Sequence, residues 1–70
     1  MNIKSQAIIT ELKQAVAEER RITTRILKLL RQVQDGRYYL GLGYSSLFDF
    51  TVRELGYAQD AAARRIGAMR

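Results

Sequence analysis

The sequence contains no cysteine, histidine, proline or tryptophan among its 70 residues. Without cysteine it can form neither a disulfide framework nor a thiolate metal site. Without histidine it lacks the most common transition-metal ligand and the most common general base at neutral pH. These absences exclude a structural zinc site, a Ser-His-Asp triad and a histidine-dependent metal nuclease centre within these residues.

Long apolar runs are also missing. Uninterrupted apolar stretches are no longer than four residues, far short of the roughly 20 that span a bilayer. The N-terminal segment Met1-Asn2-Ile3-Lys4 lacks the apolar run of a signal peptide. We therefore expect no membrane partner and a cytoplasmic location.

Positive charge exceeds negative charge, with 12 Lys and Arg against 7 Asp and Glu and a net charge of +5. Nine of the 12 cations are arginine, the residue better suited to bidentate contacts with phosphates and base edges. A hydrophobic content of 47% is typical of a folding domain and not of a disordered basic tail. The length predicts one domain, residues 1–70, with one small core.

Residues 5–34 have the pattern of a long amphipathic helix. Apolar residues recur at steps of three and four, which place them on one helix face. This stripe, interrupted at Glu19, consists of Ile8, Leu12, Ala15, Ile22, Ile26, Leu29 and Val33. Every segment outside the glycine-containing connection is compatible with helix, so the predicted fold class is all-α, with three or four helices.

The ends of this first helix are marked by polar residues and glycine. Asn2 or Ser5 can cap its start, and Gly36 is predicted to end it in the left-handed conformation. Thr23 and Thr24 could each cap a new helix. The sequence therefore leaves open one continuous helix or two helices with a break near residues 21–24.

Residues 36–44 form a connection rich in glycine and tyrosine. Its glycines supply turns, and we expect Tyr38, Tyr39 and Leu40 to anchor it to the core. A phosphate-binding loop at 41–43 is the weaker interpretation, because no strand precedes it and no Lys-Ser/Thr pair follows it.

Residues 45–55 and 58–70 are predicted to be the two helices of a helix-turn-helix. Ser46 and Asp49 have the spacing of a capping box at the start of the first of them. Asp49 can also pair with Arg53, four residues later.

The turn between these helices carries the spacing on which the prediction depends. A helix-turn-helix often has glycine in its turn, where φ is positive, and Gly56 fits that position. Tyr57 follows as the apolar plug between the helices. Ala62 is small enough for close packing, and Ile66 fills the next core position.

The outward face of the last helix is then the candidate nucleic-acid surface, because Arg and Gln donors suit phosphate and base-edge contacts. The candidate binding residues are Gln59, Ala63, Arg64, Arg65 and Arg70, with Arg20 and Arg21 of the first helix as supplementary phosphate contacts. Asp60 counts against contact with phosphate, although its position also suits the helix dipole. The alternative is a small helical bundle with Arg64 and Arg65 merely solvated.

The first helix carries a net charge of +4 over residues 1–34. These cations could track DNA phosphates, or they could be only the solvated side of an amphipathic helix. A second hypothesis is that two copies pack their stripes antiparallel as a homodimer, with both recognition helices on one side, and it can hold together with DNA binding. The alternative function is a helical dimerisation or protein-interaction module without direct DNA contact. A membrane-surface helix over residues 4–31 is disfavoured, because no Trp or Phe anchors it.

An enzymatic function is the weakest interpretation. Each carboxylate lies beside a cation or at a predicted helix end, and none forms an acid–base or metal-binding pair. We therefore expect no catalytic residue, no cofactor, no metal and no small-molecule substrate in these residues.

Residues 18–70 resemble the N-terminal helical region of bacterial HNH endonuclease-like proteins, whose hallmark reads R-x-Y-L-x-L-G-Y-S-S-L-F and continues to E-L-G and R-R-I. The matching positions are Arg37, Tyr39, Leu40, Leu42, Gly43, Tyr44, Ser45, Ser46, Leu47, Phe48, Glu54, Leu55, Gly56, Ala61, Ala62, Arg64, Arg65 and Ile66. Phe50 replaces the usual Tyr, and Ala58 replaces the usual Ser. The HNH motif of such proteins lies far downstream. The resemblance thus implies a DNA-associated accessory domain of a nuclease, in a longer protein of which these residues are a fragment.

Overall fold

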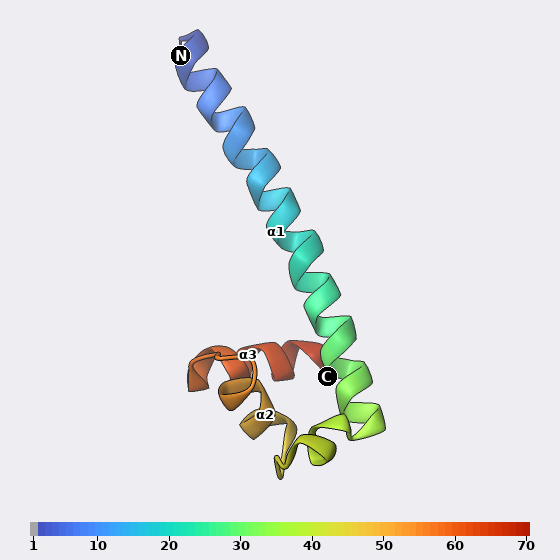
Figure 1. Cartoon of the computed structure of the whole chain (residues 1–70). Helices are drawn as coiled ribbons and strands as arrows, with labels where there is room; N and C mark the ends of the chain where they lie inside the picture. Colours follow the sequence, from blue (N-terminus) through green and yellow to red (C-terminus); the bar gives the residue numbers. More distant parts are fainter. Residues whose placement is uncertain (1) are drawn as a thin grey trace.

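The computed structural model describes residues 2–70, and this part of the chain is helical without any strand. The elements in chain order are α1 (Ile3–Gly36), the 3-10 helix η1 (Tyr38–Leu42), α2 (Leu47–Arg53) and α3 (Gln59–Met69). The three short elements gather at the C-terminal end of α1, and the rest of α1 projects from them (Figure 1). The predicted all-α fold, with a long N-terminal helix packed against the C-terminal helices, is confirmed.

The first helix is continuous, so the alternative of a break near residues 21–24 is wrong. Asn2 caps its start, where the side-chain Oδ1 accepts a hydrogen bond of 2.8 Å from the Ser5 amide. Thr24 does not cap a second helix, because its hydroxyl donates to the Arg20 carbonyl oxygen at 3.0 Å within the same helix. None of the described residues forms a helix long and apolar enough to cross a membrane.

The end of α1 differs from the prediction at one residue. Arg37, and not Gly36, adopts the left-handed conformation, with φ 51° and ψ 38°. The Arg37 amide donates back to the Gln34 carbonyl oxygen at 3.2 Å. Glycine at position 36 has another role, because a Cβ there would overlap the ring of Tyr38. Gly36 therefore permits a close approach of the ring to the helix.

The core lies between α2, α3 and the last third of α1. Its buried side chains are Leu30, Leu47, Phe50, Ile66 and Met69, with Ile26, Leu27, Val33, Tyr39 and Tyr44 packed against them. Tyr39 is thus the only one of the three predicted anchors that reaches the core. Tyr38 and Leu40 are 65% and 54% exposed, because successive residues of a 3-10 helix point about 120° apart.

Two hydroxyl groups stabilise α2 through local hydrogen bonds. The Ser46 Oγ accepts a hydrogen bond of 3.0 Å from the Asp49 amide, which confirms the predicted cap. The predicted Asp49–Arg53 ion pair also forms, at 2.9 Å. Thr51 is fully buried, and its hydroxyl donates to the Leu47 carbonyl oxygen at 2.8 Å. The helix covers Leu47–Arg53 and not the predicted 45–55, because residues 54–58 form the corner that follows.

Candidate nucleic-acid interface

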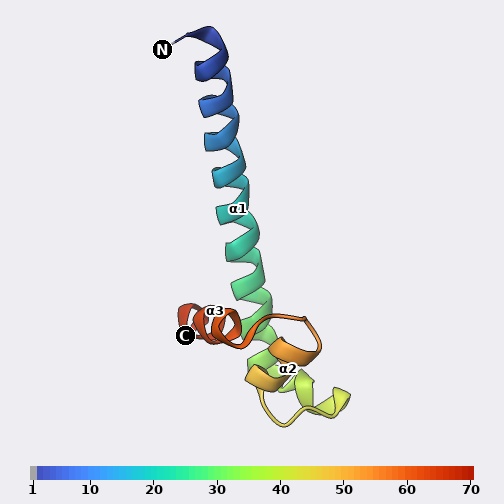
Figure 2. The same ribbon diagram turned by 90° about the vertical axis from the view of Figure 1, so that its left-hand side faces the viewer.

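The corner between α2 and α3 is built around Gly56, whose φ of +79° is the left-handed conformation that glycine adopts without strain. Backbone amides of the corner satisfy carbonyl groups at the end of α2. The Gly56 amide donates to Val52 at 3.1 Å, and the Tyr57 amide donates to Thr51 at 3.3 Å. The chain then turns sharply into α3, as Figure 2 shows. The predicted glycine corner is present.

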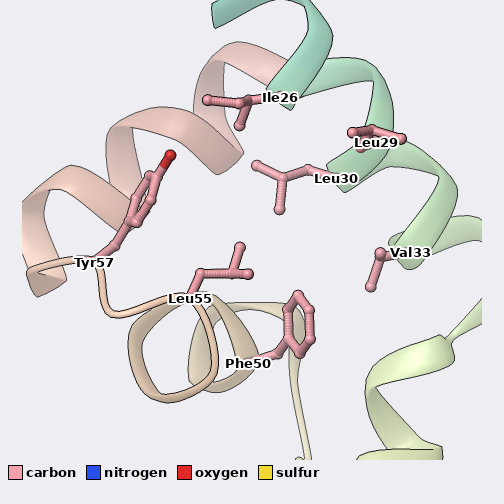
Figure 3. Close-up of a pocket in the computed structure, with 7 residues that line it drawn as sticks. All are labelled: Ile26, Leu29, Leu30, Val33, Phe50, Leu55 and Tyr57. Atoms are coloured by element: carbon pink, nitrogen blue, oxygen red, sulfur yellow. The ribbon is translucent and has the colours of Figure 1, made fainter. Parts of the chain in front are cut away.

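The corner sets which face of α3 is buried. Ala62 is completely inaccessible to solvent, and Ile66 and Met69 are buried on the same face. Tyr57 is half-buried and lines an apolar pocket between the corner and α1 (Figure 3). With this face occupied, the opposite side of α3 faces solvent.

The predicted site residues of α3 do not all share one face. Gln59, Ala63 and Arg70 fall within about 40° of one another at 100° per residue, and Ala63 and Arg70 line one shallow hollow beside α2. Arg64 lies farther outward, with its side chain 74% exposed. Arg65 is half-buried on the other flank. The structure therefore presents one flank and the outer edge of α3 to solvent.

Arg64 has a carboxylate neighbour at this surface. Its Nη1 lies 3.6 Å from the Asp60 Oδ2, and both side chains are about three-quarters exposed. An ion pair in such an exposed setting contributes little free energy. The guanidinium of Arg64 can therefore leave Asp60 for another anion at small cost.

Arg20 and Arg21 are exposed but lie apart from this surface. They precede the buried Leu30 by about ten residues, which is roughly 15 Å along the helix axis. They precede Ile26, the first residue of α1 that packs against the core, and so belong to the part of α1 that projects (Figure 1). They do not join the α3 residues in a single patch of one chain.

Two side-chain contacts that hold the site together have no counterpart among the sequence predictions. The Arg31 Nη1 donates to the Met69 carbonyl oxygen at 3.4 Å and ties the end of α3 to α1. The Tyr44 hydroxyl donates to the Glu54 carboxylate at 2.7 Å, and the Tyr44 ring meets Phe50 edge-on at 5.9 Å. Helical periodicity carries no signal for either contact, because the partners lie on different elements.

The hydrogen bond from Tyr44 also affects its ionisation. It raises the pKa of the Tyr44 hydroxyl above the ordinary value of 10.0, mainly because deprotonation breaks the bond to Glu54. Desolvation and the negative charge of Glu54 act in the same direction. The contact therefore joins the connection after η1 to the corner as long as Tyr44 is protonated.

Residues 2–70 hold no group of three or more carboxylate, His or Cys side chains placed to bind a metal ion. The apolar pocket of Figure 3 has a volume of about 310 Å³ and is lined by Ile26, Leu29, Leu30, Val33, Phe50, Leu55 and Tyr57.

Comparisons of the chain with protein-family models, curated proteins and solved structures find no match.

Proposed function

We propose that α2 and α3 form a helix-turn-helix that binds double-stranded DNA through α3. The observation that carries this proposal is the corner at Gly56, which buries Ala62 and Ile66 and leaves Arg64 extended into solvent. A recognition helix needs this division between a packed face and a polar face.

The chemistry of the exposed surface of α3 suits a nucleic-acid groove. Gln59 and Arg64 supply donors for base edges and phosphates. Ala63 and Gly67 are small and exposed, so the backbone can come close to a groove wall. The net charge of +5 favours approach to a polyanion.

The resemblance to HNH endonuclease-like proteins supports an accessory role for this module. We infer that it positions a nuclease-like protein on DNA, and no catalytic step is assigned to its own residues. Such a role fits the expected cytoplasmic location in a bacterial cell.

The test is duplex binding measured by fluorescence anisotropy at 50 and 200 mM salt. The variant Arg64→Ala should bind about tenfold more weakly. It should also lower the slope of log affinity against log salt by about one if Arg64 neutralises one phosphate. Lys4→Ala, which removes an exposed cation from the far end of α1, is the matched control and should retain most of the affinity. Equal affinity and slope in Arg64→Ala and the wild type would overturn this assignment.

We also propose that α1 joins two copies of the chain. The specific observation is the apolar stripe on the projecting part of α1, where Ile8, Leu12 and Ile22 are 58–61% exposed. Apolar side chains at this spacing are normally covered by another helix. Sedimentation equilibrium tests this second proposal, and a monomer at several hundred micromolar would overturn it.

A further inference from the structure

The uncovered stripe of α1 continues into the apolar pocket beside the corner. Leu29, which is 49% exposed, lies in the stripe and also lines the pocket. Across the pocket stand Leu55 and Tyr57 of the corner (Figure 3). One apolar strip therefore runs from Ile8 to the corner, and a single long helix could cover it.

The stripe has the repeat of a coiled-coil seam. Its positions, including Glu19, alternate four and three residues apart from Ile8 to Val33. A strict seven-residue repeat of this kind is typical of helices that supercoil around a partner helix. The occupant best suited to such a seam is a helix with the same repeat.

We propose that the occupant is the α1 helix of a second copy, antiparallel and in one defined register, an inference that rests on the proposed dimer. In this register Leu12 faces the partner's Leu29, Ala15 faces the partner's Ile26, and Ile8 faces the partner's Val33. Each pair occurs twice because the dimer has a twofold axis. The partner's Ile8 and Leu12 then lie at the mouth of the pocket beside the corner and fill it.

Charge favours this orientation. Glu18 and Arg25 flank the seam on the same side. In the antiparallel register, Glu18 of each copy lies beside the partner's Arg25. Neither residue has an ion pair within the described chain. They cannot pair within one helix, because seven residues separate them by about 10 Å along the axis.

A parallel dimer lacks this complementarity. It would place Glu19 of one copy opposite Glu19 of the partner inside the seam, where like charges repel. It would also place Glu18 beside the partner's Thr23 and Arg25 beside the partner's Leu30, with no opposite charges paired. The antiparallel register places Glu19 opposite the partner's Ile22 instead.

This register connects the dimer to the proposed DNA surface. The core contacts α1 at Leu27 and Leu30, which lie on one flank of the seam, and also at Ile26 and Val33 of the seam itself. A twofold axis perpendicular to the coil then leaves both helix-turn-helix units on the same side, with the two Leu30 residues about 28 Å apart along the coil. The two attachment points are thus separated by a distance of the same order as one turn of DNA, about 34 Å, which is the spacing that helix-turn-helix dimers need between their recognition helices. Arg20 lies seven residues before Leu27, so both copies of Arg20 fall between the two units on that side.

Single cysteines test the orientation, because the natural chain has none. We would mix Leu12→Cys and Leu29→Cys in a thiol–disulfide buffer without DNA and identify the disulfide-linked species by mass. The antiparallel register predicts the mixed dimer as the main species and almost no self-linked Leu12→Cys, whose two sulfurs would be about 25 Å apart.

The outcomes separate the proposals. Self-linked dimers of each variant would show a parallel pair and overturn the register while leaving the dimer intact. A dimer in sedimentation that yields no mixed disulfide would also overturn the register. A monomer would overturn both the register and the dimer, and none of these results bears on DNA binding.

A charge exchange tests the Glu18–Arg25 contact independently. Glu18→Arg and Arg25→Glu should each weaken self-association about tenfold, because each turns two opposite-charge contacts into two like-charge contacts. The double variant should restore the wild-type dissociation constant. Arg21→Glu, which makes the same charge change away from the seam, is the matched control and should have little effect. Failure of the double variant to restore association would contradict the assigned register.

Discussion

Replacing Gly56 with alanine isolates the backbone conformation of the corner from its packing. A Cβ added at Gly56 would meet no atom within 4 Å, so the substitution creates no clash. The cost comes only from the φ of +79°, which L residues adopt poorly. Gly41→Ala is the matched control, because its surroundings are equally open and its φ is not in the left-handed region.

The two substitutions should shift the melting temperature differently. Holding alanine in the left-handed conformation costs about 1–2 kcal/mol, and a change of 1 kcal/mol shifts the melting temperature of a domain this size by about 4–8 °C. Gly56→Ala should therefore melt about 4–16 °C below the wild type. Gly41→Ala should melt at the same temperature or slightly higher, since it reduces the entropy of the unfolded chain.

Thermal unfolding followed by circular dichroism measures both variants under identical conditions. The protein concentration must be held constant, because self-association makes the midpoint concentration-dependent. Equal midpoints for Gly56→Ala and Gly41→Ala would refute the positive φ at Gly56 as the feature that orients α3.

Three further perturbations test the fold around the corner. Leu30→Ala should lower the free energy of unfolding by about 2–5 kcal/mol in a denaturant titration, because Leu30 is 3% exposed. Leu12→Ala, at an exposed position of the same helix, should change the stability of a dilute sample much less. Ser46→Ala should cost about 1 kcal/mol by removing the cap of α2, and the exposed neighbour Ser45→Ala should be nearly neutral in the same titration. Because the folded-state pKa of Tyr44 is raised, its stabilisation is complete below about pH 10 and disappears as pH rises through the folded pKa. The advantage of the wild type over Tyr44→Phe should therefore shrink in alkaline buffer, and a constant difference up to pH 12 would contradict the contact with Glu54.

The sequence predicted the elements that depend on local chemistry. The steps of three and four along α1, the cap at Ser46 and the glycine at 56 each specify structure within a few residues. The prediction that Gly36 adopts the left-handed conformation was wrong for a different physical reason. A glycine that makes room for the ring of Tyr38 cannot be distinguished in sequence from a glycine that adopts a positive φ.

Contacts between distant residues were not predictable in the same way. The stripe of α1 is similarly apolar at Leu12 and Leu29, so periodicity alone did not indicate that α2 and α3 pack only on its C-terminal part. The bond from Arg31 to Met69 depends on the angle at which α3 returns to α1. That angle depends on how α3 packs against α1 as well as on the glycine corner, and helical periodicity does not specify this packing.

DNA binding through α3 is tested most directly by an NMR titration of the isotope-labelled chain with a short DNA duplex. We expect the largest amide shift changes along α3, at Gln59, Ala63 and Arg64, with smaller changes near Arg20. Shifts confined to the N-terminal turns of α1, or an unchanged spectrum at saturating duplex and low salt, would contradict DNA binding by the helix-turn-helix.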